Sequence, residues 1–339
     1  MKKVFACILI LALSAAMLTA CNGGPGGGGD AIYESGTIRL IVPLGVGGTS
    51  DLVVRKYAAV AGRLFPDFNF IVVNMTGGDG FAGADYFADS SPDAANVFYI
   101  HYGGIYRHDI GRAYGTEDVV WDLYNIQSLA TIDNRTWIVY VNIGTTLEDI
   151  LDLARNGTLR MSGGNPLSDP HLAFGSLMVA EGGNVLVIPY DGGAMQRQAL
   201  INDEVDVWIG TTQAGIEETY AGIMIPILAI ADDTVTFAGP DGDIIVPSVV
   251  GGNRHPALSQ DHPASIIPAG GLISVRRGAP QGWIDLQIEI ANAVMSDPEF
   301  YGWMHENMLE FHFIFGEDAE RYVADASALA MDAFRALRG

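Results

Sequence analysis

Apolar and polar positions follow two alternating patterns along most of the chain. From residue 36 onward, short apolar runs are followed by stretches in which apolar residues recur at helical spacing, as at Leu52, Val53 and Tyr57. The strands expected in the first part of the chain are 38–44, 70–73 and 97–101. This alternation of strand and helix is typical of an α/β fold with a largely parallel sheet.

The middle of the chain repeats this plan, and the end is helical. Its expected strands are 159–162, 185–188, 205–209 and 225–231. Helices are expected after the first two strands, through about Asp89, and then at 146–157, 169–183, 194–202, 280–296, 298–308 and 317–337. The stretch 232–271 is rich in Gly, Pro and Asp without a clear period, and it is expected to consist of loops and a crossing segment.

Helix starts are marked by capping residues. Thr49 or Ser50 is expected to cap the first helix. Thr146, with Asp149 three residues later, has the spacing of a capping box. Asp169 is expected to cap the helix that has a proline in its first turn.

Several predicted strands end in glycine-rich loops that lead into a helix. These loops are 45–48, 77–80, 163–168, 189–193 and 210–213. In an open α/β sheet, ligands bind outside the carboxyl ends of the strands, where backbone N–H groups and helix N-termini favour an anion. Hydroxyl groups are expected at the same edge from Thr49, Ser50, Ser168, Thr211 and Thr212. The pattern favours a carboxylate-binding site, although glycine at a strand–helix turn is also common without any ligand.

The first thirty residues resemble a lipoprotein export signal. Lys2 and Lys3 precede an apolar stretch too short to span a bilayer comfortably, and small residues end it. The stretch ends at Cys21 in the pattern of a bacterial lipobox, so 1–20 is expected to be a signal peptide and Cys21 a lipidation site. A glycine-rich tether, 21–30, follows. The alternative is an ordinary signal peptide in which Cys21 is incidental.

The charge excludes nucleic acid as a partner. The chain carries 18 basic and 40 acidic residues, a formal charge of −22, and loss of Lys2 and Lys3 with the signal peptide brings this to −24. Phosphate binding needs a basic face, whereas a local cluster of backbone N–H groups can bind a small anion against an unfavourable net charge.

Signatures of common enzyme classes are missing from the sequence. The run 45–49 lacks the lysine of a phosphate loop, and no Gly-x-Ser-x-Gly elbow occurs. His305–Glu306 has no second histidine for zinc, and Asp241–Gly–Asp243 is too short for a calcium loop. We therefore expect no catalytic residues, no metal site and no cofactor.

Four blocks together resemble the substrate receptors of tripartite tricarboxylate transporters, the TctC or Bug family. They are 38–51 followed by Arg55; 73–74 with Gly77 and Gly83; 188–194 with Leu200 and 205–206; and 296–298. The first block has the family's strand, proline, Gly-Gly-x-x-Asp loop and helix, and the third resembles its Val-Pro-Tyr-x-Gly-Gly block. The resemblance covers roughly 37–313.

This resemblance implies a periplasmic-binding-protein-like fold of type II, with two α/β lobes joined by a hinge. Lobe 1 would comprise 31–136 plus 252–339, and lobe 2 would comprise 137–251. The family's function implies an extracytoplasmic, lipid-anchored monomer that captures a small organic acid or amino acid for integral-membrane permease subunits. The membrane would be contacted through the lipid anchor only.

The ligand-binding residues that the resemblance implies come from loops of both lobes. They are Gly45, Gly47, Gly48, Thr49, Ser50 and Asp51 in lobe 1, and Gly163, Gly164, Ser168, His171, Tyr190, Gly192, Gly193, Gly210, Thr211 and Thr212 in lobe 2. Within this set, Asp51 is expected to brace its loop and helix rather than to touch an anion.

The chain also departs from the family pattern. Leu44 replaces an aromatic residue, Asp191 stands where lysine is frequent, and 232–268 matches poorly. The loss of that lysine favours a monocarboxylate, a zwitterionic amino acid or an amide over a highly charged ligand such as citrate. A ligand-sensing lipoprotein that presents its closed form to a signalling partner is the alternative function.

Overall fold

The computed structural model describes residues 33–77, 80–92, 94–115, 125–190, 192–239, 242–309 and 313–338. The expected signal peptide, the tether with Cys21, and both Asp191 and Asp241 lie outside these residues. The described part belongs to one compact unit, Tyr33–Gly339, that contains two five-stranded sheets.

The first sheet has the strand order β2-β1-β3-β12-β4. Its strands are β1 (Gly36–Val42), β2 (Phe68–Asn74), β3 (Asn96–His101), β4 (Ile126–Arg135) and β12 (Ala269–Arg276). β1 pairs in parallel with β2 and β3, whereas β12 pairs antiparallel with β3 and β4. Four strands therefore share one direction, and β12 runs against them.

The second sheet repeats this arrangement with the order β7-β6-β8-β5-β9. Its strands are β5 (Trp137–Asn142), β6 (Leu159–Gly163), β7 (Val185–Pro189), β8 (Val207–Thr211) and β9 (Met224–Ile230). Here β5 is the reversed strand, antiparallel to β8 and β9. We call the first sheet with its helices lobe 1 and the second sheet with its helices lobe 2. β4 and β5 are adjacent in sequence but lie in different lobes. The chain boundaries proposed for the lobes stay a prediction.

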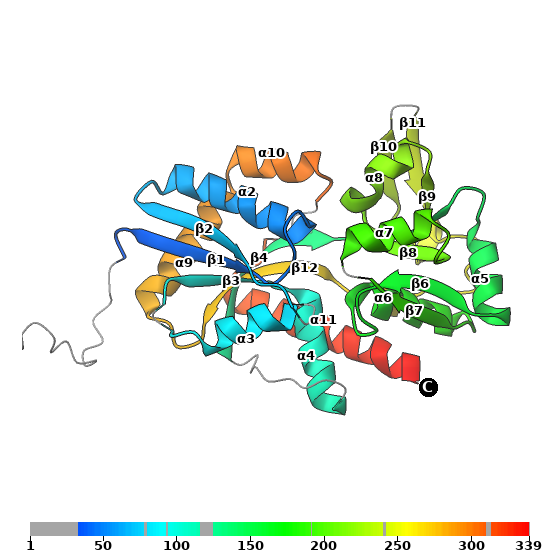
Figure 1. The fold of residues 1–339 in the computed structure, drawn as a ribbon, viewed down its shortest axis with the longest axis horizontal. Coiled ribbons are helices and arrows are strands. Elements are labelled where there is room, and N and C mark those ends of the chain that lie inside the picture. Colours follow the sequence, from blue (N-terminus) through cyan, green and yellow to red (C-terminus); the bar gives the residue numbers. More distant parts are fainter. Residues whose placement is uncertain are drawn as a thin grey trace, which may run out of the picture. The chain divides into compact units, whose positions relative to one another are not determined.

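Helices cover both faces of the lobe 1 sheet (Figure 1). They are α2 (Thr49–Leu64), α9 (Gln281–Met295) and α10 (Pro298–Glu306) on one face, and α3 (Phe81–Asp89) and α4 (Tyr102–Tyr114) on the other. The alternation along β1 explains the two layers. Ile38, Leu40 and Val42 pack in the cluster that contains α2, whereas Ile41 packs in the cluster that contains α3.

Lobe 2 is built in the same way. Its helices are α5 (Leu147–Asn156) and α6 (Asp169–Ala180) on one face, with α7 (Gly193–Ile201) and α8 (Thr212–Tyr220) on the other. The last helix, α11 (Gly316–Arg338), packs against β4 and α4 of lobe 1 and against α6 of lobe 2. Because of these contacts, one apolar core runs through α4, α6 and α11 and joins the lobes.

Most of the predicted strands and helices are confirmed to within a few residues, and the sheets are largely parallel as expected. The capping box at Thr146 and Asp149 is present in full. Two other caps were wrong. Gly48 is the N-cap of α2, and Ser168 is the N-cap of α6, so Asp169 is the first helical residue.

The expectation that 232–271 consists of loops and a crossing segment was wrong for part of this stretch. It contains the hairpin of β10 (Val235–Gly239) and β11 (Gly242–Val246), the short 3₁₀ helices Gly251–Asn253 and Pro263–Ser265, and the start of β12. The hairpin packs Phe237 and Val246 into the lobe 2 core. The alternation of apolar and polar residues in these two strands is short and is interrupted by the glycine and aspartate residues between them, so the sequence did not reveal the hairpin.

Candidate functional site

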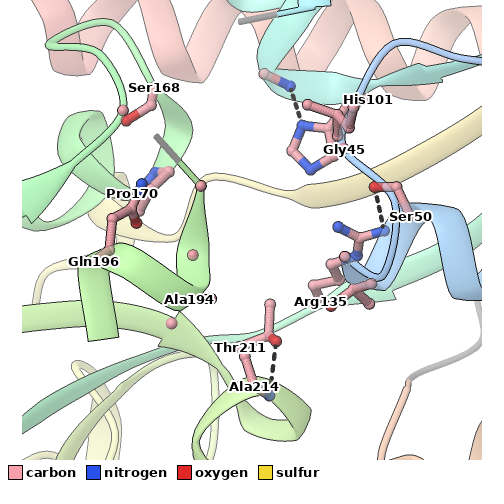
Figure 2. Close-up of a pocket in the computed structure, with 18 of the residues that line it drawn as sticks. Gly45, Ser50, His101, Arg135, Ser168, Pro170, Ala194, Gln196, Thr211 and Ala214 are labelled. Atoms are coloured by element: carbon pink, nitrogen blue, oxygen red, sulfur yellow. Dashed lines mark hydrogen bonds between the residues drawn. The ribbon is translucent and has the colours of Figure 1, made fainter. Parts of the chain in front are cut away.

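A cavity of about 1080 Å³ is lined by loops of both lobes where the strands end. Figure 2 shows residues of lobe 1, among them Gly45, Ser50 and Arg135, facing residues of lobe 2 such as Ser168 and Gln196. Eleven of the sixteen predicted residues line it: Gly45, Gly47, Gly48, Thr49, Ser50, Gly164, Ser168, Gly192, Gly193, Gly210 and Thr211. Ligand contact by these residues stays a prediction.

Six helices begin at the cavity. Residues at the N-terminal ends of α2, α3, α4, α6, α7 and α8 all belong to its lining. This convergence follows from topology, because each helix follows the carboxyl end of a strand and those ends meet at one edge of each sheet. The free N–H groups and dipoles of six helix starts add partial positive charge at the cavity without requiring many basic side chains.

The first loop of lobe 1 is held from behind by Asp51. Its Oδ2 accepts hydrogen bonds from the backbone N–H of Gly47 and from Nε of Arg55, both at 2.9 Å. Asn74 donates to Oδ1 at 2.9 Å and also to the carbonyl of Leu44. Burial alone would raise the pKa of Asp51, but these donors outweigh burial and lower it. Asp51 is buried and does not line the cavity, so it braces the loop.

A buried charge cluster lies beside this loop. Arg135 ends β4, and its Nε donates to Oδ2 of Asp133 at 2.5 Å. Its Nη2 donates to the hydroxyl of Tyr99 at 2.6 Å and to that of Ser50 at 3.2 Å. The Tyr99 hydroxyl in turn donates to Oδ1 of Asp133 at 2.8 Å. Burial alone would lower the pKa of Arg135, but the charge of Asp133 outweighs burial and raises it. Arg135 lines the cavity with its charge already compensated.

His101 and Asp169 face each other across the lobes. His101 caps α4, and its Nδ1 accepts from the N–H of Gly103 at 3.2 Å. Burial, followed by the charge of Arg135, lowers the pKa of His101 to about 3, so the ring is neutral. Oδ2 of Asp169 lies 3.8 Å from Nδ1 of His101. A side chain at Gly103 would collide with the Asp169 carboxylate, which explains glycine at this close approach.

Four other predicted residues lie outside the cavity lining. Gly163 is buried against Val187, and its carbonyl accepts from the N–H of Tyr190. His171 is buried in α6, and burial lowers its pKa to about 4. The Tyr190 hydroxyl donates to Glu204 at 2.8 Å, and the Thr212 hydroxyl donates to the carbonyl of Met308 at 3.0 Å.

Several lining residues were not predicted from the sequence as part of the site. They include His101, Arg135, Trp137, Gln196, Arg197 and Glu218. For His101 the signal was available, because it ends a predicted strand at the same edge as the glycine loops, whereas Arg135 ends β4, which was not predicted. Trp137 begins the reversed strand β5, which brings its start to this edge.

Two further surveys cover the described residues only. Within them, no cluster of three or more His, Cys, Asp or Glu side chains is placed to hold a metal ion. No helix in that part of the chain is long and apolar enough to cross a membrane.

Comparison with known proteins gives matches by structure alone. No protein-family model matches the chain, and no curated protein sequence does. A TctC solute-binding protein from Polaromonas is similar at a TM-score of 0.61 and 18% identity, over 89% of this chain and 99% of that one. An R. palustris protein with adipate gives a TM-score of 0.74 at 18% identity, over 89% and 97%. The chain has the fold of the TctC-type solute-binding proteins.

Other TctC-type structures agree with this assignment. MatC from Rhodopseudomonas palustris with bound malate gives a TM-score of 0.66 at 16% identity, over 89% of this chain and 97% of that one. The periplasmic binding protein BugD gives 0.71 at 17% identity, with the same coverage. The resemblance to the TctC and Bug proteins is therefore confirmed for the fold, including its two α/β lobes.

Proposed function

We propose that the protein is an extracytoplasmic receptor that captures a small carboxylate-bearing solute between its lobes for a tripartite tricarboxylate-type transporter. The observation that carries this proposal is the convergence of six helix starts and five glycine-bearing loops on one cavity. That arrangement suits an anion because backbone N–H groups and helix dipoles can replace the water around a carboxylate.

The charges around the cavity favour a ligand with few negative charges. Its lining contains Arg107, Arg135 and Arg197, but Glu218 pairs with Arg197 at 3.0 Å, as Asp133 does with Arg135. Asp169, Glu217 and Glu306 add further negative charge to the lining. A monocarboxylate or a zwitterion fits this balance better than a citrate-like anion. The solved relatives hold adipate and malate, which makes small organic acids the first compounds to test.

Closure of the lobes would be the mechanism of capture. The hydroxyl of Thr49 in lobe 1 already donates to Oε1 of Gln213 in lobe 2 at 3.2 Å, and both residues line the cavity. The two lobes also share the core built on α11, so closure would bend the crossing segments around a preserved base. A solute that is enclosed between the lobes, and so shielded from water, would bind the closed form more tightly than the open form and would therefore stabilise it.

Substitution of two glycines tests the site. A side chain at Gly48 would meet only the carbonyl of Gly45 at 3.5 Å, and one at Gly193 would meet nothing within 4 Å, so both would project into open space. Gly48→Val and Gly193→Val are expected to abolish carboxylate binding in calorimetric titrations while the unfolding midpoint stays close to that of the wild type. Gly302→Val is the matched control, because Gly302 also has open space but lies outside the lining. Normal carboxylate binding by both cavity variants would contradict the assignment of this cavity as the ligand-binding site.

We further propose that Cys21 is lipidated and that permease subunits receive the solute. A Cys21→Ser variant expressed in a bacterial host should lose incorporation of radiolabelled fatty acid and leave the membrane fraction. Membrane association that persists in the variant would contradict the lipid anchor.

A further inference from the structure

The guanidinium of Arg135 is held in place by three partners from its own lobe. Nε donates to Oδ2 of Asp133 at 2.5 Å, and Nη2 donates to the hydroxyls of Tyr99 at 2.6 Å and Ser50 at 3.2 Å. Asp133 belongs to β4, Tyr99 to β3 and Ser50 to α2. Because partners on three elements fix the plane of the guanidinium, a ligand bound through it would immobilise little further side-chain freedom.

One nitrogen of this guanidinium stays open to the cavity. Nη1 donates to no acceptor among the described residues, yet it is not one of their buried atoms that lack a partner. Nη1 is therefore accessible, although the side chain of Arg135 is more than nine-tenths buried. Arg135 lines the cavity, and Figure 2 shows its guanidinium beside Ser50 at the lobe 1 edge of the open space. A solute in the cavity can thus reach Nη1.

The start of α2 lies next to this guanidinium. Ser50 is the second residue of the helix, so its hydrogen bond to Nη2 places Arg135 at the first turn. The N-cap is Gly48, and no side chain caps the N–H groups of this turn. Free N–H groups at a helix start carry partial positive charge and favour an anion. A carboxylate that accepts from Nη1 would therefore also approach the donors of α2.

Stability alone does not account for a charged cluster at this place. Replacement of a buried ion pair by apolar residues is often neutral or even stabilising. The negative charge of Asp133 offsets the charge of Arg135, but it leaves the N–H groups of Nη1 free to donate. Such a donor forms a charge-assisted hydrogen bond with a carboxylate, and the offset charge gives no advantage to a ligand with several negative charges.

We propose that Arg135 anchors the carboxylate of the solute through Nη1, and that Ser50 is the positioning residue that holds the guanidinium against the start of α2. A carboxylate oxygen would accept the hydrogen bond from Nη1. A neutral amide of the same shape also presents an oxygen to Nη1, but it carries no charge and should bind more weakly. This inference rests on the proposed function and names the side chain that selects a carboxylate over a neutral solute.

Calorimetric titration with charged and neutral probes tests the anchor. The probes are the four- to six-carbon monocarboxylates, adipate and malate, each with its neutral amide. The wild-type protein should bind the best carboxylate about 30-fold more tightly than its amide, as expected for a hydrogen bond between charged groups. Asp133→Asn combined with Arg135→Gln removes both charges and leaves amide groups in their place. This double variant should bind the carboxylate only about threefold more tightly than the amide, through a loss of carboxylate affinity alone.

A second variant keeps the test independent of the folding of the first. Ser50→Ala removes one partner of the guanidinium and should weaken carboxylate binding about 3- to 10-fold, with amide binding unchanged within about twofold. The matched control combines Arg155→Gln with Glu181→Gln, which neutralises an ion pair of 2.8 Å outside the cavity lining. It should lower stability and leave the ratio of carboxylate to amide affinity as in the wild type.

The two possible failures are distinguishable. A purely structural role of Arg135 predicts equal losses for carboxylate and amide. The wild-type affinity ratio in the folded double variant, or in Ser50→Ala if the double variant does not fold, would overturn the anchor and leave the proposed function standing. Failure of every carboxylate to bind the wild-type protein would instead overturn the proposed function, and the anchor with it.

Discussion

Replacement of Asp133 by asparagine should destabilise the protein sharply. Asp133 is fully buried, and its carboxylate compensates the guanidinium of Arg135, whose side chain is only 6% exposed. Asparagine preserves the shape of the side chain but leaves a positive charge in the interior without its counter-charge. The Tyr99 hydroxyl, which donates to the same carboxylate, also loses a charged acceptor.

The expected loss follows from the geometry. Removing one partner of a buried ion pair costs about 3–5 kcal/mol. An unfolding entropy of about 2.1 cal/mol/K per residue gives about 0.6 kcal/mol/K for a body of roughly 300 residues, so the midpoint should fall by about 5–8 °C. The surface pair of Asp318 and Arg321, both about two-thirds exposed, supplies the control. Asp318→Asn should shift stability by less than about 1 kcal/mol.

Ligand binding makes the same variant more informative. The uncompensated Arg135 lines the cavity, so a bound carboxylate would supply the missing negative charge. Thermal unfolding of Asp133→Asn with and without carboxylate should therefore show a larger ligand-induced rise than the wild type. A loss of stability no larger than that of Asp318→Asn would refute the view that Asp133 and Arg135 form a buried, mutually dependent pair.

Four further substitutions have definite expected outcomes. Glu181, buried at the end of α6, accepts hydrogen bonds from Arg155, His262 and Ser259. Burial alone would raise the pKa of Glu181, but these donors outweigh burial and lower it. The contribution of Glu181 to the free energy of unfolding is therefore present above its unfolded pKa, about 4.3, and is lost as pH falls below that value. Glu181→Gln should lose about 3 kcal/mol at pH 7 in urea unfolding and show a flatter acid limb, and an unchanged acid limb would contradict this role. Gln213→Ala removes the acceptor for the Thr49 hydroxyl and should weaken carboxylate binding about 3- to 10-fold. Most of this loss should appear as faster ligand dissociation in stopped-flow measurements. An unchanged dissociation rate would show that the closed form does not depend on this contact. Gly83→Ala would place a new Cβ 2.9 Å from Pro43 and should destabilise the protein by about 1–3 kcal/mol. Gly62→Ala in α2, where there is room for a Cβ, should instead stabilise the protein by about 0.5–1 kcal/mol. Equal effects of the two substitutions on the unfolding free energy would argue against tight packing of α3.

Helices and strands that are marked by nearby capping residues, glycines or apolar periodicity could be predicted from the sequence. The helix after Thr146 follows from a capping box four residues long and from a glycine stop, and the structure reproduces both. β4 was not predicted because its polar residues are buried by distant partners. Asp133 and Arg135 pair with Tyr99, and Thr131 receives the N–H of Ile314. No local period reveals such contacts.

The candidate site divides in the same way. Its glycine loops could be predicted because the carboxyl ends of same-direction strands meet at one edge, whatever their side chains. The direction of single side chains could not. Thr211 lines the cavity, whereas its neighbour Thr212 turns to the carbonyl of Met308, and Tyr190 turns to Glu204.

The most direct test of the central claim is thermal unfolding of the purified protein with a panel of small carboxylates and their neutral amides or alcohols. Any co-purified solute should first be removed by unfolding and refolding. A carboxylate at 100 times its dissociation constant stabilises by about 2.7 kcal/mol, which should raise the midpoint by about 4 °C. A selective rise with monocarboxylates, absent in Gly48→Val, is the predicted result. Midpoints that stay the same across the whole carboxylate panel would contradict carboxylate capture in this cavity.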